Sequence, residues 1–309
     1  MIKSTGPLAG LIDAAAEVVL GHRRVIQLAL ACVLARGHLL IEDLPGMGKT
    51  TLAHTLARLF GLHYARIQFT SDLLPADLLG VSIFDQVAQR FRFHTGPVFA
   101  QLVLADEINR ATPKTQSALL EAMEEHCVTV DGETRPLPEP FFVIATQNPS
   151  DQIGTFPLPE SQLDRFLMRL TMGYPDRAAE RQLLQGTDRL ALAKTLAPVL
   201  SPARLIEYQA QVAMIHVSEP LLAYCQDLLA HSRHSGTFLH GLSPRAGMAL
   251  LRSARALAFL GGRDYVVPED VQGVLPACFG HRLTANPATE VASRSYDPAR
   301  RLLEAVPVP

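Results

Sequence analysis

The apolar positions of the first half of the chain form short continuous runs, which predict strands that are buried on both faces. These runs lie at residues 39–42, 64–69, 102–105 and 141–146. Between and before them, apolar residues recur at helical spacing, which predicts helices over 8–19, 24–36, 50–60 and 113–126. Alternation of strands and helices favours an α/β fold with a parallel sheet flanked by helices.

The pattern changes after residue 174, where strand-like runs end and helical periodicity continues. Several of the predicted helices begin with a proline at the first helical position, where its missing N–H costs nothing. All the helices predicted in this part of the chain lie at 177–185, 202–214, 219–231, 244–260 and 268–275. The sequence therefore predicts an α/β core at 1–174 and a smaller all-helical domain at 175–309, in which the residues after 296 form an arm or a frayed tail.

Two stretches of the predicted core carry hairpin signals. Residues 70–95 are irregular, and their apolar segments at 81–84 and 91–94 can pair across the intervening polar residues. The stretch at about 127–138 has the turn Asp131-Gly132 between two short strand-like runs. We expect an insert at about 70–95 and a separate hairpin at about 127–138.

Composition narrows the functional class. The 309 residues include 28 basic and 30 acidic side chains, so the net charge of -2 creates no overall field that would attract nucleic acid or anionic lipid. The longest nearly apolar run, about 25–35, is shorter than the roughly 20 residues of a membrane-spanning helix. The four cysteines lack CxxC spacing, which indicates free thiols in a reducing compartment. These features, with no signal-peptide pattern, predict a cytoplasmic protein.

The segment DLPGMGKT at 43–50 lies between a predicted strand and a predicted helix. Gly46 and Gly48 allow backbone N–H groups to approach phosphate oxygens, and the following helix directs its positive end at them. Lys49 can neutralise the outer phosphates, and the Thr50 hydroxyl can ligate magnesium. The usual pattern GxxxxGK[ST] has glycine where this chain has Asp43, a residue that tolerates tight turns better than most. The predicted nucleotide-binding residues here are Pro45, Gly46, Met47, Gly48, Lys49, Thr50 and Thr51.

Two carboxylates, Asp106 and Glu107, end the apolar run at 102–105. Carboxylates at the end of a buried strand are costly unless a cation lies nearby, which favours a functional site over a solvated turn. Asp106 can hold the magnesium shell while Glu107 polarises an attacking water. Asn148, after the next strand, can orient that water and sense the terminal phosphate. Together these residues predict binding of a nucleoside triphosphate with magnesium and hydrolysis of its terminal phosphate.

With these motifs the chain resembles the AAA+ ATPases, and specifically the MoxR family. The resemblance is carried by segments at 43–50, 68–75, 96–99, 105–111, 116–125, 158–166, 243–246 and 262–270, which span nearly the whole chain. It implies an ATPase core with a helical lid, a homo-oligomeric ring usually of six subunits, and ATP with Mg²⁺ as cofactors. It also implies that the insert and the hairpin project toward the pore or the upper face of the ring.

The resemblance also assigns roles to individual side chains. Arg165, in the triplet DRF, matches the arginine finger that reaches the terminal phosphate of a neighbouring subunit, with Arg169 as the competing choice. Arg245 matches the second sensor, which ties the lid angle to the nucleotide state. Gly21 and His22 match the region that packs near the adenine, and a simple break between two helices is the alternative interpretation.

The resemblance implies ATP-driven remodelling, assembly or activation of a partner complex, commonly together with a separate protein that bears a von Willebrand factor A domain. A magnesium chelatase-like or DNA-acting ATPase is one alternative, although the chain lacks a basic stripe interleaved with aromatic residues. A nucleotide-gated scaffold with little turnover is the other, and the presence of Glu107 and Arg165 argues against it. We expect a homo-oligomer with no membrane span and no nucleic-acid partner.

Overall fold

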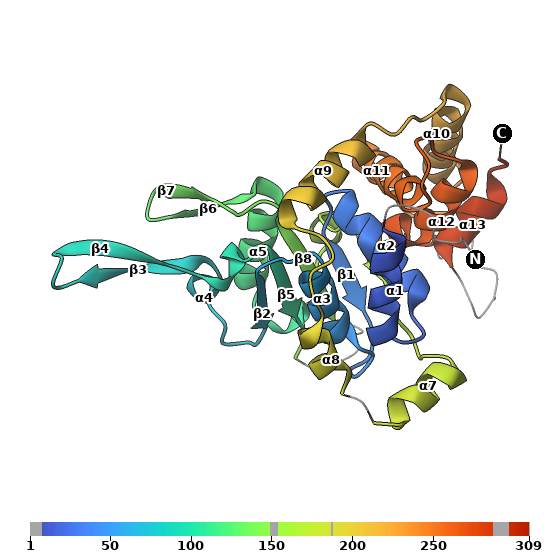
Figure 1. The fold of residues 1–309 in the computed structure, drawn as a ribbon. Helices are drawn as coiled ribbons and strands as arrows, with labels where there is room; N and C mark the ends of the chain where they lie inside the picture. Colours follow the sequence, from blue (N-terminus) through green and yellow to red (C-terminus); the bar gives the residue numbers. More distant parts are fainter. Residues whose placement is uncertain (1–7, 149–153, 187, 287–296, 309) are drawn as a thin grey trace.

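A computed structural model describes residues 8–148, 154–186, 188–286 and 297–308. At its centre lies a five-stranded sheet in the order β2-β5-β8-β1-β9, in which all neighbours are parallel (Figure 1). The strands are β1 (Leu39–Glu42), β2 (Tyr64–Gln68), β5 (Leu102–Asp106), β8 (Phe142–Gln147) and β9 (Met168–Leu170). Because the strands are parallel, their carboxyl ends meet at one edge of the sheet.

The hydrophobic pattern predicts four of these strands at nearly the observed boundaries, and it does not predict β9. Strand β9 is only three residues long, and Arg169 interrupts its apolar run. It pairs with β1 alone, with Leu39 opposite Met168. A segment this short has no recognisable period, so only its pairing in the folded sheet identifies it as a strand.

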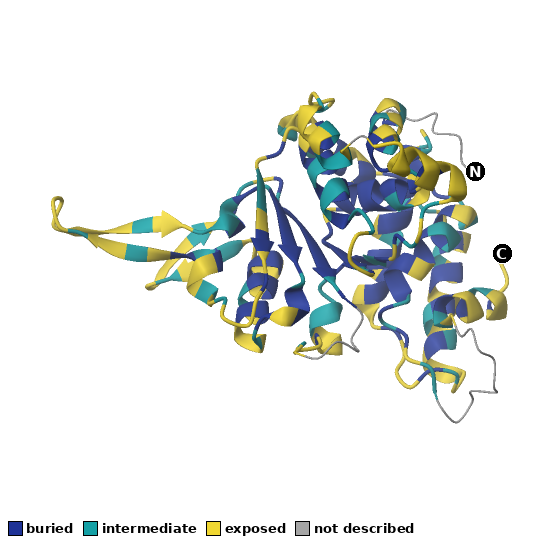
Figure 2. Ribbon diagram, turned by 90° about the horizontal axis from the view of Figure 1, so that it is seen from below, coloured by how far each residue is buried: buried dark blue, intermediate teal, exposed yellow. Residues whose placement is uncertain are grey.

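Alternating side chains of the strands divide the core into two clusters, one on each face of the sheet. Figure 2 shows that the strands of the central sheet are mostly buried. On one face, Ile41 and Leu104 pack with helices α1 (Ala9–Val18), α2 (Arg23–Leu34) and α3 (Lys49–Leu59). On the other face, the strand residues that are next in sequence to those of the first cluster pack with α5 (Pro113–Glu125). Burial on both faces explains why the strands are continuous apolar runs.

Two antiparallel hairpins project side by side from one end of the molecule (Figure 1). One consists of β3 (Gly80–Asp85) and β4 (Arg90–Thr95), preceded by the short helix α4 (Pro75–Leu79). The other consists of β6 (Cys127–Val130) and β7 (Glu133–Pro136). The guanidinium carbon of Arg135 lies 4.0 Å from the ring centre of Phe93, so a cation–π contact joins the two hairpins.

The chain after β9 is helical. Its helices are α7 (Arg177–Leu184), α8 (Arg189–Thr195), α9 (Pro202–Ala213), α10 (Glu219–His234), α11 (Pro244–Leu260), α12 (Pro268–Phe279) and α13 (Pro298–Ala305). The Ser201 and Ser243 hydroxyls accept hydrogen bonds from N–H groups in the first turns of α9 and α11. Each of these two helices has a proline in its first turn. The remaining short elements are α6 (Glu160–Leu163) and two 3-10 turns, η1 (Pro97–Phe99) and η2 (Ile108–Arg110).

Two of these helices were not expected from the pattern. Helix α8 has seven residues, too few for a clear period, and its start is fixed by the Asp188 side chain. The prediction of an arm or frayed tail after 296 is wrong, because Ala299 and Leu302 of α13 are fully buried. Their apolar contacts with the other helices make α13 part of the packed helical region.

The helical region packs directly on the sheet-bearing part of the chain. One hydrophobic cluster runs from α1, α2 and α3 into α9, α10, α11 and α12 without a gap. The division of the chain at residue 174 therefore stays a prediction. Among the described residues, no helix is long and apolar enough to cross a membrane.

Candidate active site

The loop between β1 and α3 lies open at the carboxyl edge of the sheet. Gly46 and Gly48 have φ angles of 84° and 88°, a region in which residues with a Cβ are strained. Apart from Gly46 and its two chain neighbours, no described atom lies within 4 Å of the position that a Cβ would take at Gly46, so this part of the loop faces free space. Helix α3 begins at Lys49, and in the described structure no side chain caps its N-terminus. Its first N–H groups are therefore available to an anion.

Lys49 is buried at the base of this loop. Its Nζ donates a 2.6 Å hydrogen bond to the backbone carbonyl of Asp43. Burial lowers the pKa of Lys49, while the nearby carboxylates of Asp43, Asp106 and Glu107 act in the opposite direction. A cation held among these carboxylates marks the place where a phosphate would meet positive charge.

Asp43 replaces the glycine of the common loop pattern, and its contacts explain how the loop accommodates it. Its carboxylate accepts hydrogen bonds from the backbone N–H groups of Met172 at 2.8 Å and Gly173 at 2.7 Å. It also accepts one from the N–H of Leu44 at 2.8 Å. Asp43 does not adopt a positive φ, so the position does not require glycine. The side chain ties the loop to the segment that follows β9.

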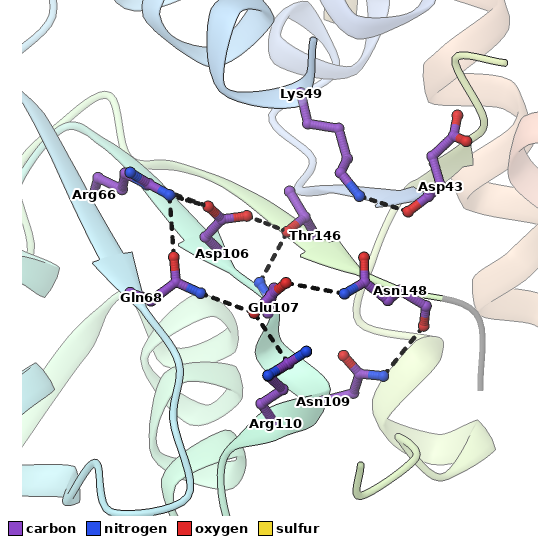
Figure 3. A network of polar contacts seen from close by, with 10 residues as sticks. All are labelled: Asp43, Lys49, Arg66, Gln68, Asp106, Glu107, Asn109, Arg110, Thr146 and Asn148. Carbon is purple, nitrogen blue, oxygen red and sulfur yellow. Dashed lines mark hydrogen bonds and ion pairs between the residues drawn. The ribbon is translucent and has the colours of Figure 1, made fainter. Parts of the chain in front are cut away.

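Asp106 is the last residue of β5, and both oxygens of its carboxylate are occupied (Figure 3). Oδ2 pairs with the guanidinium of Arg66, whose Nη2 lies 2.6 Å away. Oδ1 accepts a 2.6 Å hydrogen bond from the hydroxyl of Thr146 on the adjacent strand β8. Parallel pairing of β2, β5 and β8 brings these three side chains to one edge of the sheet.

Glu107 turns away from Asp106 because its backbone is left-handed, with φ 57° and ψ 49°. Such a conformation is rare for residues other than glycine, asparagine and aspartate, and it costs energy. The N–H of Glu107 donates to the Thr146 hydroxyl at 2.9 Å, which helps to hold this turn. The left-handed turn therefore separates the directions of two consecutive carboxylates.

The Glu107 carboxylate is fixed by three neighbours (Figure 3). Asn148 Nδ2 donates to Oε1 at 2.9 Å, and Gln68 Nε2 donates to Oε2 at 3.0 Å. The guanidinium of Arg110 lies 3.1 Å from Oε2. Asn148 is thus adjacent to the acidic residue, as the order of the strands in the sequence suggested.

These groups enclose one polar cavity of about 340 Å³. We call it the phosphate cavity. It is lined by Pro45, Gly46, Gly48, Lys49, Thr50, Thr51, Arg66, Asp106, Glu107 and Asn148. The predicted loop residues, the two acidic residues and Asn148 are therefore together, with the exception of Met47, which packs against the hydrophobic core.

Gly21 and His22 are not among the described residues that line the phosphate cavity. A Cβ on Gly21, whose φ is 76°, would lie 3.0 Å from the Cβ of Ala179 and 3.3 Å from that of Pro175. His22 is buried, and this burial lowers its pKa against the opposing influence of Asp43. The pair therefore packs where the chain enters the helical region, and its relation to an adenine base stays a prediction.

The predicted arginines lie in a different place. Arg165 and Arg245 line a second polar cavity of about 200 Å³, which we call the arginine cavity. Neither of them is among the described residues that line the phosphate cavity. Arg169 lies in neither lining; it pairs with Glu42 at 2.8 Å and donates to the carbonyl of Gly280. Within one chain, the structure brings the loop and the acidic residues together and leaves the arginines apart.

Four residues in contact with the acidic pair were not predicted: Arg66, Gln68, Arg110 and Thr146. Arg66 and Gln68 are two residues apart on β2, so both side chains point to the face of the sheet that also carries Asp106. The sequence offered one signal for this pair: two polar residues, two positions apart, lie near the end of a segment that is otherwise strand-like. Thr146 gave none, because threonine is common in strands.

Comparison with known proteins identifies the family. Residues 38–168 match the ATPase family associated with various cellular activities, and residues 230–300 match the AAA lid domain. The chain is 43% identical to the uncharacterised protein YeaC of Bacillus subtilis over 98% of its own length and 95% of the relative. It is 40% identical to chaperone MoxR1 of Mycobacterium tuberculosis, covering 86% of this chain and 73% of that one.

A solved structure agrees with these matches. A crystal structure from Cytophaga hutchinsonii, described as that of a candidate ATPase, superposes with a TM-score of 0.88 at 37% identity. The match covers 98% of this chain and 94% of that chain. Three observations therefore point to the same family. They are the AAA domain followed by a lid domain, the similarity to MoxR proteins over nearly the whole chain, and the phosphate loop with its acidic strand. The chain belongs to the MoxR family of AAA+ ATPases, and it is an ATP-hydrolysing enzyme.

Proposed function

We propose that this protein is a remodelling ATPase that works as a homo-oligomeric ring and uses ATP hydrolysis to assemble or activate a partner complex. Six subunits are the number that the family resemblance implies. In this proposal the phosphate cavity of one subunit is completed by the arginine cavity of its neighbour. ATP turnover then depends on contact between subunits.

One observation carries the proposal: among the described residues, the phosphate cavity has acids, a lysine and backbone donors, but neither Arg165 nor Arg245 lines it. Arg66, the arginine that lines it, is already paired with Asp106. Charge that accumulates on the transferred phosphoryl group requires further positive charge for stabilisation. Arg165 and Arg245 supply two guanidinium groups in one place, separate from the phosphate cavity of the same chain.

The residues of the phosphate cavity have distinct tasks in this proposal. The N–H groups of the glycine loop and Lys49 bind and orient the phosphates. Glu107 removes a proton from the attacking water, and Asn148 holds the Glu107 carboxylate at the correct angle. The left-handed turn at Glu107 keeps this base separate from the metal-binding carboxylate of Asp106.

Magnesium fits the donor set, because Mg²⁺ is commonly held by one or two carboxylates together with substrate phosphates. The Thr50 hydroxyl and the Asp106 carboxylate, which both line the cavity, would hold it. When bound, the ion neutralises charge on the phosphate oxygens. Asp106 is also paired with Arg66, so its carboxylate would be shared between the guanidinium and the ion.

Arg165 is the finger in this proposal, and Arg169 is not. Arg169 lies on a strand and is fixed between Glu42 and the backbone of Gly280. Arg165 follows α6 and lies beside Arg245 of the lid helix α11. A pair of arginines from the core and the lid can report the neighbour's nucleotide state to both parts of the chain.

The partner is a separate polypeptide in this proposal. The relative MoxR1 is named a chaperone, and the family resemblance implies a partner with a von Willebrand factor A domain. Membership of the MoxR family favours this function over a magnesium chelatase or a DNA-acting ATPase. The two intact carboxylates favour turnover over a scaffold role.

The shared site is tested by mixing two inactive variants and measuring phosphate release. Glu107→Gln removes the base, and Arg165→Ala removes the finger while leaving nucleotide binding intact. Each variant alone should lose about a thousandfold of turnover. An equal mixture should recover about a quarter of the parental rate, since that share of random interfaces has one intact cleft and one intact finger.

Two results would contradict the shared site. One is a mixture no more active than the sum of its components. The other is full turnover by a dilute preparation that is monomeric in analytical ultracentrifugation. The remodelling role has its own test: Glu107→Gln with ATP should retain a purified von Willebrand factor A domain protein from the same genome, and the nucleotide-free protein should not. Equal retention in both states would argue against a nucleotide-driven partner.

A further inference from the structure

The arginine cavity has a surplus of positive charge. Among the described residues, its lining includes the arginines Arg36, Arg165, Arg245, Arg252 and Arg282 and two carboxylates, Glu124 and Asp164. Guanidinium groups remain charged at every physiological pH, so they repel one another unless anions lie between them. The positions of the two carboxylates therefore determine where the arginines point.

The two carboxylates have different partners. Asp164 binds Arg282 at 2.6 Å, and Arg245 approaches it only to 3.8 Å. Glu124 binds Arg165 through Oε2 at 3.1 Å and Arg245 through Oε1 at 3.2 Å. Glu124 thus holds both arginines to which the family resemblance assigns a role, Arg165 as the finger and Arg245 as the second sensor.

The last turn of α5 fixes Arg165 at two points. Its Nη1 donates a 2.7 Å hydrogen bond to the carbonyl of Leu120, and its Nη2 meets the carboxylate of Glu124 one turn later. Arg245 reaches the same carboxylate from the first turn of α11 in the lid. A single side chain therefore connects a core helix, the loop after α6 and the lid.

We propose that Glu124 is the positioning residue for Arg165 and Arg245. It holds the two guanidinium groups together and in a common direction, so that they meet the terminal phosphate of the neighbouring subunit as a pair. This inference rests on the proposed function, in which these arginines act between subunits. Glu124 itself does not touch the nucleotide in this scheme and acts through the arginines.

The exposure of these side chains indicates that stability is not the main contribution of the contacts. The side chains of Arg165, Glu124 and Arg245 are 28%, 35% and 45% exposed. Ion pairs exposed to this extent contribute about 0–1 kcal/mol to folding. A catalytic group displaced by about 1 Å, in contrast, can lower a rate about a hundredfold. Removal of the Glu124 charge should therefore change turnover much more than stability.

The test uses the full-length chain and Glu124→Gln, which keeps the size of the side chain but leaves one acceptor oxygen for two arginines. We expect kcat to fall about tenfold, with KM for ATP within about twofold of the parent. The midpoint of thermal unfolding should stay close to that of the parent. Glu125→Gln is the matched control, because the next residue of the same helix is exposed, and its turnover should equal the parental value.

Subunit mixing distinguishes positioning from a structural role. A Glu124→Gln subunit keeps an intact phosphate cavity and supplies misplaced arginines, whereas a Glu107→Gln subunit does the reverse. An equal mixture should exceed the sum of the two separate rates and approach about a quarter of the parental rate. Glu124→Asp, which keeps the charge on a shorter side chain, should give an intermediate rate.

The outcomes separate this inference from the proposed function. If Glu124→Gln retains the parental kcat while Arg165→Ala loses it, the inference is wrong and the shared site stands. If Glu124→Gln loses turnover and mixing does not restore it, Glu124 acts within its own subunit and the inference is also wrong. If Arg165→Ala retains full turnover, the proposed function itself fails.

Discussion

The phosphate cavity and the arginine cavity differ in how their charges are balanced. In the phosphate cavity, each carboxylate has partners from the same chain: Asp106 binds Arg66, and Glu107 binds Arg110. In the arginine cavity, five arginines face two carboxylates. The charges of the phosphate cavity are therefore balanced within one chain, whereas the arginine cavity keeps an excess of positive charge. The difference indicates that the acidic half of the site can be recognised within one chain, while the proposed role of the arginines depends on a neighbouring subunit.

The largest effect is expected for Lys49→Ala, which tests whether binding belongs to the phosphate cavity alone. Loss of the lysine removes the charge that faces the phosphates, so we expect turnover to fall by about a thousandfold or more. Binding of a fluorescent ATP analogue should be lost as well. Arg245→Ala should retain that binding, since Arg245 is not part of the phosphate cavity. Equal loss of binding in both variants would erase the contrast between the two cavities.

The second largest effect is expected for a change of pH, which should alter stability through a histidine in the wall of the arginine cavity. His38 lines this cavity and is buried, and burial lowers its pKa from 6.5 to about 4. Its Nδ1 accepts from the N–H of Val143 at 3.0 Å, so Nε2 carries the proton and donates to the carbonyl of Met123 at 3.1 Å. Protonation of Nδ1 would break the first of these bonds.

The sign follows from the lowered pKa. Between pH 6.5 and 4 the unfolded chain binds more protons than the folded one, so the stability present above pH 6.5 is lost as the pH falls. From pH 7 to pH 5 His38 should cost about 2 kcal/mol of the free energy of unfolding, measurable by urea titration. His38→Gln, which can still accept and donate, should lose about 2 kcal/mol less over the same interval. The same pH dependence in both proteins would show that His38 is not the responsible group.

The smallest effect is expected for Thr146→Val, which keeps the shape of the side chain and removes its hydroxyl. The hydroxyl donates to Asp106 and accepts from the N–H of Glu107, so its loss frees both acidic residues to move. We expect about a tenfold decrease in kcat, with little change in nucleotide affinity. Thr134→Val, in the exposed β6–β7 hairpin, is the control. A parental rate for Thr146→Val would show that the left-handed turn at Glu107 is held by other contacts.

Much of the fold could be predicted because it depends on local patterns. The strands at 39–42, 64–69, 102–105 and 141–146 are continuous apolar runs, and the helix at 113–126 has a clear period. Strand β9 and helix α8 are too short to show a period, and the order of the strands depends on pairing between distant segments. The burial of α13 depends on the helices around it and not on its own residues.

The candidate site was predictable to the extent that its chemistry is written in motifs. The loop at 43–50 and the acidic pair stand out because glycine, lysine and carboxylates are needed at fixed spacing. Arg66 and Thr146 could not be identified in this way, since their importance comes from the register of β2, β5 and β8. Glu124 was hidden among the other acidic residues of its helix, and only the convergence of Arg165 and Arg245 on it distinguishes it.

Residues 137–141 connect the β6–β7 hairpin to the central strand β8, whose last residues, Thr146 and Gln147, lie beside the phosphate cavity. Hydrogen bonds to β5 on one side and to β1 on the other prevent β8 from sliding on its own. A displacement of the hairpin would therefore act on a strand that is paired on both sides. The hairpin is thus joined to the middle of the sheet, and the contact of Arg135 with Phe93 couples it to the second hairpin.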